Sequence, residues 1–308
     1  MKKKERMKIY TLLLGALFVS PTQAQTMHDW ENHHVLQINR EPARAAFTPF
    51  SVQKGDGSIS LDGTWKFRWT PVPNERVMNF YQTNFNDKDW TDFPVPANWE
   101  VNGYGTPIYV SAGYPFKIDP PRVMGEPKTD YTTYKERNPV GQYRRTFVLP
   151  AGWEANGQTF LRFEGVMSAF YVWINGKRVG YSQGSMEPSE FNVTKYLKSG
   201  ENQISLEVYR YSDGSYLEDQ DFWRFGGIHR SIHLIHTPDI HVRDYAVRTL
   251  PASAGDYEDF ILQIDPQFSV YRGMTGKGYI LQGVLKDASG KEVATLKGDV
   301  EDMLDLEH

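Results

Sequence analysis

The chain has 308 residues, no cysteine and a formal net charge of −4 at pH 7. A chain of this length can bury a substantial core without disulfide bonds, and the lack of cysteine also excludes a lipid anchor on a processed cysteine. The isoelectric point near 6.1 implies no basic field for nucleic acid or for an anionic membrane surface. We therefore expect neither of these as a partner.

The amino terminus has the pattern of a secretory signal peptide. Lysines at positions 2 to 4 precede an apolar run at residues 9–19, and small residues follow up to Ala24. The apolar run is too short for a comfortable transmembrane helix, which needs about 20 apolar residues. We expect residues 1–24 to be cleaved, the mature chain to begin at Gln25, and the protein to be periplasmic or secreted.

Short alternating runs bounded by Gly, Asn, Asp and Pro recur along the chain, whereas helical periodicity is almost absent. Within residues 58–69, aromatic side chains occupy every second position, Trp65, Phe67 and Trp69. Lysine and arginine stand between them. This pattern predicts a strand with one buried face.

Asn175 and Gly176 interrupt an apolar run and predict a hairpin, because both central positions of a type I′ turn need a positive φ. Further alternating runs predict strands at 158–163, 203–209 and 232–235. Many short strands with evenly spaced turns favour a β-sandwich, most simply a jelly roll. Residues 94–139 differ from this pattern, since they contain eight prolines and several aromatic residues, and we expect a long structured loop there.

The first domain is expected to span residues 25–238 and to end near His236. Residues 239–305 contain four more alternating runs, one of them at 279–285. An immunoglobulin-like sandwich usually needs about 100 residues, so we expect this second domain to be a partial, truncated one. Residues 306–308 look like the remnant of an affinity-tag linker.

The segment 210–230 is the most distinctive part of the chain. It contains four acids, three arginines and five aromatic residues. Carboxylates accept hydrogen bonds from hydroxyl groups and aromatic rings cover the apolar face of a pyranose, so the composition favours a carbohydrate site. An alternative is that these acids and arginines pair with one another at a sheet edge.

The same segment resembles, nearly position for position, the β-galactosidases of glycoside hydrolase family 2, whose amino-terminal sugar-binding domain is a jelly roll. The resemblance extends in order along the chain through residues 29–40, 95–100, 103–109, 138–144, 163–170 and 188–191. It implies an all-β fold, a galactose-binding-like jelly roll followed by a partial immunoglobulin-like β-sandwich.

The resemblance also implies retaining hydrolysis of terminal β-galactosides. In that reaction one carboxylic acid protonates the leaving oxygen and a second carboxylate, roughly 5 Å away, attacks the anomeric carbon. The family carries both glutamates in a (β/α)8 barrel that follows these domains. We therefore expect no catalytic residue in this chain, no activity of the fragment alone, and the barrel of the parent chain as its partner. A homo-oligomer is compatible with the resemblance, and the sequence does not decide it.

Two residues match the family's substrate contacts. Asp221 corresponds to the acid that faces the galactose 6-hydroxyl and helps to hold a sodium ion, Na+, which suits an oxygen ligand that only accepts hydrogen bonds. Ser111 stands where many relatives have an asparagine. Because serine has a shorter reach, the contact of Ser111 with sugar is direct, water-mediated or absent, and the preferred linkage stays open. Glu218 and Asp219 are expected to make structural bonds to Arg210 or Arg224.

Five oxygen donors match the family's magnesium ligands: Asp29, Asn32, the carbonyl of Val35, Gln183 and Asp213. Such a set suits a hard cation, Mg2+, better than zinc or copper. The alternative is that these acids and amides merely cap turns.

Two other functional classes remain beside the β-galactosidase hypothesis. One is a free-standing, non-catalytic carbohydrate-binding module. The other is a related hydrolase that acts on glucuronides or mannosides, which we do not expect to share the whole segment 213–223.

Overall fold

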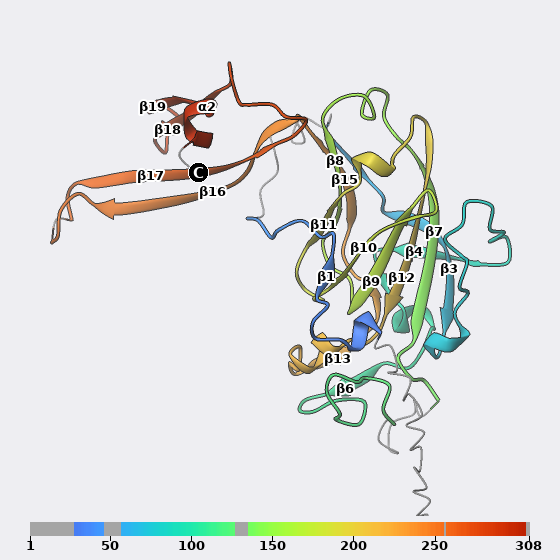
Figure 1. The fold of residues 1–308 in the computed structure, drawn as a ribbon. Helices are drawn as coiled ribbons and strands as arrows, with labels where there is room; N and C mark the ends of the chain where they lie inside the picture. The colour runs from blue at the N-terminus through green and yellow to red at the C-terminus, as the bar shows by residue number, and fades with distance from the viewer. Residues whose placement is uncertain (1–27, 46–56, 127–134, 256, 306–308) are drawn as a thin grey trace, which may run out of the picture.

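Two antiparallel sheets pack against each other and form the body of the protein (Figure 1). The computed structural model describes residues 28–45, 57–126, 135–255 and 257–305. The predicted signal peptide, residues 1–24, and the tag-like residues 306–308 lie outside this part. Among the described residues, no helix is long and apolar enough to cross a bilayer. The predicted all-β fold is confirmed.

The larger sheet has seven strands. Their spatial order is β1 (Gln37–Ile38), β10 (Lys177–Gln183), β9 (Ala169–Ile174), β12 (Glu201–Tyr209), β7 (Val140–Val148), β3 (Gly63–Thr70) and β4 (Thr91–Val95). The opposite sheet has four strands, in the order β11 (Ser189–Asn192), β8 (Gln158–Phe163), β15 (Ile232–Thr237) and β2 (Ser58–Ser60). The predicted strands at 158–163, 203–209 and 232–235 are therefore present.

The hydrophobic core lies between the two sheets. Strand β3 contributes Trp65 and Phe67, each 1% exposed, while Trp69 is partly buried against the same cluster. Strand β9 alternates in the same way, since Phe170 and its inward neighbours join this core whereas the outward side chains join a second aromatic cluster. The period-two pattern thus determined the buried face of β3, whereas β9 is covered on both faces.

The predicted hairpin connects β9 to β10. Asn175 has a φ of 50° and Gly176 a φ of 78°, as a type I′ turn requires. The Nδ2 of Asn175 also donates to the Tyr196 carbonyl, at 3.0 Å, which ties the turn to the loop after β11. The turn prediction is confirmed.

The proline-rich region contains short strands that the sequence did not indicate. These are β5 (Ala97–Asn98) and β6 (Ile108–Val110), and they pair with β14 (Gly227–Ile228) and β13 (Phe222–Arg224). Pairing with a partner more than a hundred residues away stabilises strands that are too short to show a period of their own. Short 3-10 helices complete the body: η1 (Asp29–Glu31), η2 (Pro73–Glu75), η3 (Glu100–Asn102), η4 (Thr194–Tyr196) and η5 (Asp213–Tyr216).

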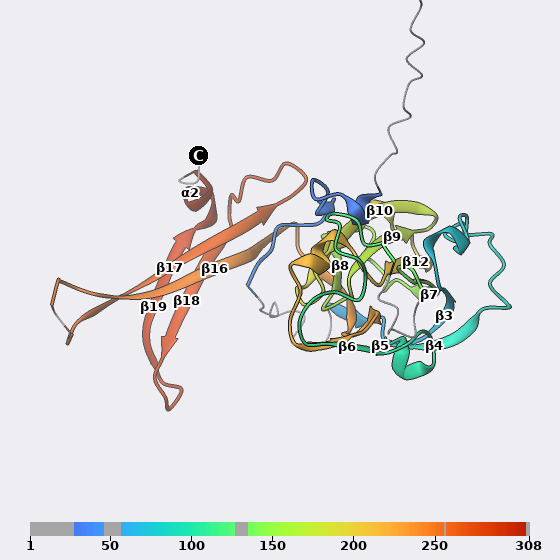
Figure 2. The same cartoon turned by 90° about the horizontal axis from the view of Figure 1, so that it is seen from below.

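The four predicted strands after residue 239 form two hairpins, which lie to one side of the sandwich (Figures 1 and 2). Strand β16 (Ile240–Pro251) pairs with β17 (Phe260–Val270), and β18 (Ile280–Lys286) pairs with β19 (Glu292–Asp299), followed by α2 (Val300–Asp305). Assignment of this part to an immunoglobulin-like domain stays a prediction.

Gly141 in β7 allows the close approach of a buried indole. A Cβ at this position would lie 2.4 Å from Cζ2 of Trp99 and 2.9 Å from Cε2 of Phe67, and Trp99 is fully buried. We expect Gly141→Ala to lower the free energy of unfolding by about 1–3 kcal/mol, as overpacking of a core does. Urea denaturation followed by tryptophan fluorescence measures this.

Gly283 in β18 is the matched control, because a Cβ there meets no atom within 4 Å. Gly283→Ala should leave the urea midpoint unchanged or slightly raised. Equal effects of the two substitutions would contradict the close contact between Gly141 and Trp99.

Candidate functional site

The two-stranded sheet of β6 and β13 lies at one end of the sandwich (Figure 1). In its antiparallel register Tyr109 is opposite Trp223, and their ring centroids are 5.7 Å apart. Their side chains point outward, with Tyr109 51% and Trp223 49% exposed, while Ile108 and Val110 are buried. The sheet therefore holds a tyrosine and a tryptophan side by side at the surface.

The register also brings together the two predicted substrate contacts. Val110 pairs with Phe222, so Ser111 directly after β6 and Asp221 directly before β13 occupy the next, facing positions. Both residues are exposed. The Tyr109 hydroxyl donates a hydrogen bond to Oδ1 of Asp221, and this bond raises the pKa of the tyrosine. Tyr109 was part of the motif at 103–109, but its role beside Asp221 was not predicted, because only the strand register reveals it.

A buried guanidinium holds both strands of this sheet. Nη2 of Arg210 donates to the carbonyls of Thr106, at 2.8 Å, and Arg224, at 2.6 Å, which lie just before β6 and at the end of β13. Arg210 also forms ion pairs with Glu100, at 3.2 Å, and Glu136, at 3.5 Å. Burial raises the pKa of Glu100, against the opposing effect of Arg210. The buried side chain of Arg210 therefore holds the strands that carry the exposed aromatic residues in position.

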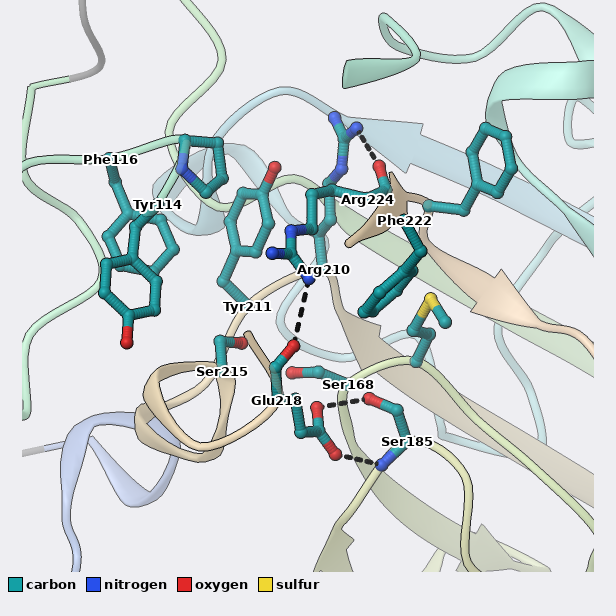
Figure 3. Close-up of a pocket in the computed structure, with 13 residues that line it drawn as sticks. Tyr114, Phe116, Ser168, Ser185, Arg210, Tyr211, Ser215, Glu218, Phe222 and Arg224 are labelled. Carbon is teal, nitrogen blue, oxygen red and sulfur yellow. Dashed lines mark hydrogen bonds between the residues drawn. The ribbon is translucent and has the colours of Figure 1, made fainter. Parts of the chain in front are cut away.

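Two further acids of the segment 210–230, Glu218 and Asp219, bond to neighbouring protein groups. Asp219 forms an ion pair with Arg224, at 2.5 Å, and also accepts the N–H of Gly113, at 3.3 Å. The Glu218 carboxylate accepts two bonds of 2.6 Å from the amide and hydroxyl of Ser185 (Figure 3). The predicted bond to arginine is thus present for Asp219. The prediction was wrong for the Glu218 carboxylate. Arg224 donates instead to the main-chain carbonyl of Glu218, at 2.9 Å.

A cavity beside Glu218 is too small for a sugar. It lies between Tyr114, Arg210, Glu218 and Phe222 and has a volume of about 30 Å³ (Figure 3). A cavity of this volume has room for only a few water molecules. Any sugar contact of this region therefore has to involve the exposed side of the β6–β13 sheet, which carries Tyr109, Asp221 and Trp223.

The predicted magnesium ligands lie on neighbouring elements. Asp29 begins η1 and Asp213 begins η5, and these two 3-10 helices are in contact. Gln183 ends β10, and its side chain lies beside Gly214 of η5. Its Nε2 is 3.5 Å from the position that a Cβ on Gly214 would take. Oδ2 of Asp29 accepts a hydrogen bond of 2.7 Å from Tyr171.

The donor set fits a hard divalent cation in one important respect. Oδ1 of Asp213 is buried and has no hydrogen-bond partner in the described part of the chain, and burial raises the pKa of this carboxyl. A cation would stabilise the charged form of such a group. Asn32 also fits the alternative, since its Oδ1 accepts the N–H of His34, at 3.2 Å, as in a turn. No cluster of three or more His, Cys, Asp or Glu that could hold a metal occurs in the described residues, and the predicted set contains only two such side chains.

Residues 59–238 match the model of the family described as glycosyl hydrolases family 2, sugar binding domain. This range covers the sandwich apart from β1 and the first residue of β2, together with the sheet of β6 and β13. The chain belongs to glycosyl hydrolase family 2. The resemblance carried by residues 210–230 is therefore confirmed at the level of the family.

Curated relatives within family 2 are longer proteins. The chain is 38% identical over 296 residues to a β-galactosidase of Priestia megaterium, an overlap that covers 92% of this chain and 27% of the relative. It is 41% identical over 238 residues to a β-galactosidase of Yersinia pestis, covering 75% of this chain and 21% of the relative. The chain thus spans about a quarter of the length of these relatives.

Solved structures share the fold of this family 2 chain. A Bacteroides uniformis β-glucuronidase 2 bound to cyclophellitol-6-carboxylate aziridine aligns with a TM-score of 0.59 and 23% identity, over 79% of this chain and 26% of that one. A β-glucuronidase of an uncultured Clostridium species aligns with a TM-score of 0.58 and 20% identity, over 84% and 40% of the two chains.

The environment of His229 predicts that the family 2 sandwich loses stability in acid. Its Nε2 lies 2.8 Å from the Ser185 carbonyl, and burial lowers its pKa. A histidine with a lowered pKa binds fewer protons in the folded than in the unfolded state, so its contribution to stability is lost as the pH falls below about 6.5. We expect His229→Gln to reduce the difference in Tm between pH 7.5 and pH 5.5.

His233 is a control for this measurement, because it is another half-buried histidine of the sandwich and lies on β15. His233→Gln should leave the Tm difference of the unmodified chain intact. If His229→Gln and His233→Gln change the pH dependence of the Tm equally, that result would contradict a specific role of His229.

Proposed function

We propose that this chain is the amino-terminal, sugar-binding part of an exported retaining β-galactosidase that hydrolyses terminal non-reducing β-D-galactosides. The observation that carries the proposal is the juxtaposition of Asp221 and Ser111 at the end of the β6–β13 ladder, beside exposed Tyr109 and Trp223. A carboxylate next to aromatic faces suits a hydroxyl-rich ring with one apolar side. The names of the β-galactosidase relatives, at 38 and 41% identity, support the choice of sugar.

The proposed site is half a pocket. Tyr109, Asp221 and Trp223 form an open surface, and the small cavity behind them cannot take a sugar. We propose that a catalytic barrel in the parent chain closes this surface and supplies both catalytic glutamates. The fragment alone is then inactive, and it binds a single galactoside weakly, because a half-solvated ligand offsets little of its ordering cost.

Domain limits, location and ions belong to the same proposal. A jelly-roll domain at 25–238 and an immunoglobulin-like domain at 239–305 follow a cleaved signal peptide, which directs the protein to the periplasm or outside the cell. Sodium would be held at Asp221 together with groups of the barrel. Magnesium would be held by Asp29, Asn32, the carbonyl of Val35, Gln183 and Asp213, and would neutralise the buried Oδ1 of Asp213.

The role of Asp221 is tested in the full-length parent with a chromogenic β-galactoside. We expect Asp221→Ala to lower kcat/KM on the order of 100-fold, since a charged hydrogen-bond partner of the sugar is lost. Asp92→Ala is the matched control, because Asp92 is an exposed acid that forms a surface ion pair with Lys66, and it should retain full activity.

Unchanged kinetics of Asp221→Ala would make Asp221 structural. A parent that hydrolyses a glucuronide but no galactoside would replace the proposed substrate class. A full-length gene product without hydrolase activity would support the binding-module alternative instead.

The magnesium site is tested on the chain itself by its melting temperature. We expect millimolar Mg2+ to raise the Tm relative to EDTA, since a ligand that binds only the folded state stabilises it, by about 2.7 kcal/mol at a concentration 100 times the Kd. Asp213→Asn should abolish most of the increase and Asp92→Ala should keep it. Equal Tm values of the unmodified chain in Mg2+ and EDTA would rule the site out.

A further inference from the structure

A groove lies on the face of the seven-stranded sheet that points away from the core, which we call its outer face. It runs between η1 and the segment 76–81 that follows η2. We call it the outer groove. Its volume is about 400 Å³, within the range of small-ligand sites in proteins. None of Tyr109, Ser111, Asp221 and Trp223 lines it. The outer groove is therefore separate from the surface proposed to meet the catalytic barrel.

Two stacked aromatic rings form one wall of the outer groove. The rings of Tyr81 and Trp173 are nearly parallel, at 6°, with centroids 5.2 Å apart. Phe80, which is fully buried, contacts Trp173 edge to face at 5.4 Å and supports it from below. Tyr81 and Trp173 themselves remain partly exposed. The pair is thus held by packing and keeps part of its surface accessible.

A fixed cation lies beside this pair. The guanidinium of Arg178 stands 4.6 Å from the ring centroid of Tyr171 and forms an ion pair of 3.1 Å with Asp29, while 47% of its side chain stays exposed. One carboxylate oxygen satisfies only part of the five N–H donors of an arginine. The remaining donors of Arg178 are available to hydroxyl groups of a ligand.

The charges that line the outer groove balance one another. Arg178 is paired with Asp29, and Arg76 is paired with Glu207, at 3.2 Å, on the sheet below. Such a lining exerts no strong net field of either sign, so it does not select an anionic or a cationic ligand. An aromatic surface with hydrogen-bond donors beside it and a neutral balance matches the chemistry of a neutral saccharide.

Packing alone accounts for only part of this arrangement. Trp30 and Tyr209 stack at 4.0 Å and are buried, so they already cover the sheet next to Tyr171. Tyr81 and Trp173 extend the aromatic surface past that covered area and into the groove. Because both rings are already held in place, a ligand that packs against them incurs little further ordering cost.

We propose that the outer groove is a second saccharide-binding site, which takes a neutral β-linked oligosaccharide with one pyranose ring packed against the Tyr81–Trp173 pair and its hydroxyl groups bonded to Arg178. It is a non-catalytic site. It would hold a longer glycan on the protein while a terminal sugar is bound elsewhere. The proposal does not depend on the hydrolase activity proposed above.

The test is isothermal titration calorimetry of the 308-residue chain with β-1,4-linked galactotetraose and with cellotetraose. We expect saturable binding of at least one of these neutral probes. Tyr81→Ala should weaken it at least tenfold, since the ring against which the sugar packs is lost. Tyr81→Phe, which keeps the ring, and Asp221→Ala, which alters the other site, should leave the affinity unchanged.

Trp173→Ala and Arg178→Ala complete the series. Trp173 packs on Phe80, so each variant is first checked by near-UV circular dichroism, and Arg178→Ala and Tyr81→Ala decide the matter if Trp173→Ala does not fold. Binding of neither probe, or binding that Tyr81→Ala and Arg178→Ala leave intact, would overturn the proposal. Binding lost in Asp221→Ala alone would place the saccharide at the β6–β13 sheet and would also overturn it.

A failure here is distinguishable from a failure of the proposed hydrolase function. In the full-length parent, Tyr81→Ala should hydrolyse a small chromogenic β-galactoside at the normal rate, because that substrate is too short to need a second site. Asp221→Ala should show the opposite pattern, with impaired hydrolysis and an intact outer groove.

Discussion

The candidate site depends on the hydrogen bonds that the buried guanidinium of Arg210 makes. This guanidinium bonds the carbonyls of Thr106 and Arg224, and so holds the two strands β6 and β13, which have only three residues each. Strands this short do not persist on their own. The carboxylates of Glu100 and Glu136 in turn compensate the buried charge of Arg210. Sandwich core, ion cluster and exposed aromatic face therefore form one connected structure.

The seven-stranded sheet serves two purposes through its two faces. Its inner face carries Trp65, Phe67 and Phe170 and closes the core against the four-stranded sheet. Its outer face carries aromatic side chains with polar ends, among them Tyr171 and Trp173, which pack together and meet charged partners. An amphipathic ring can cover a sheet and still contact water or a hydroxyl group. This is why a sandwich face that needs covering also suits the saccharide site proposed for the outer groove.

Acidic side chains of one short segment have divergent roles because their surroundings differ. Asp219 neutralises Arg224, and Glu218 satisfies the amide and hydroxyl of Ser185. Asp213 is buried with an unbonded oxygen, whereas Asp221 is exposed and accepts from Tyr109. Composition alone left open whether these acids pair with arginines or face a ligand. The local environment assigns each of them separately, since burial and nearby donors decide what a carboxylate can do.

The sequence by itself determined the local structure of this protein. The alternation through Trp65, Phe67 and Trp69 indicated a buried strand face, and Asn175 with Gly176 indicated the turn, because both signals depend only on neighbouring residues. Only the tertiary structure decided which distant residues meet. The strands β6 and β13 are too short to have a readable period, and their pairing alone places Tyr109, Ser111 and Asp221 together. Likewise, Tyr81 and Trp173 meet only because a loop folds over the outer face of the sheet. Contacts of this kind depend on long-range packing, which no local pattern encodes.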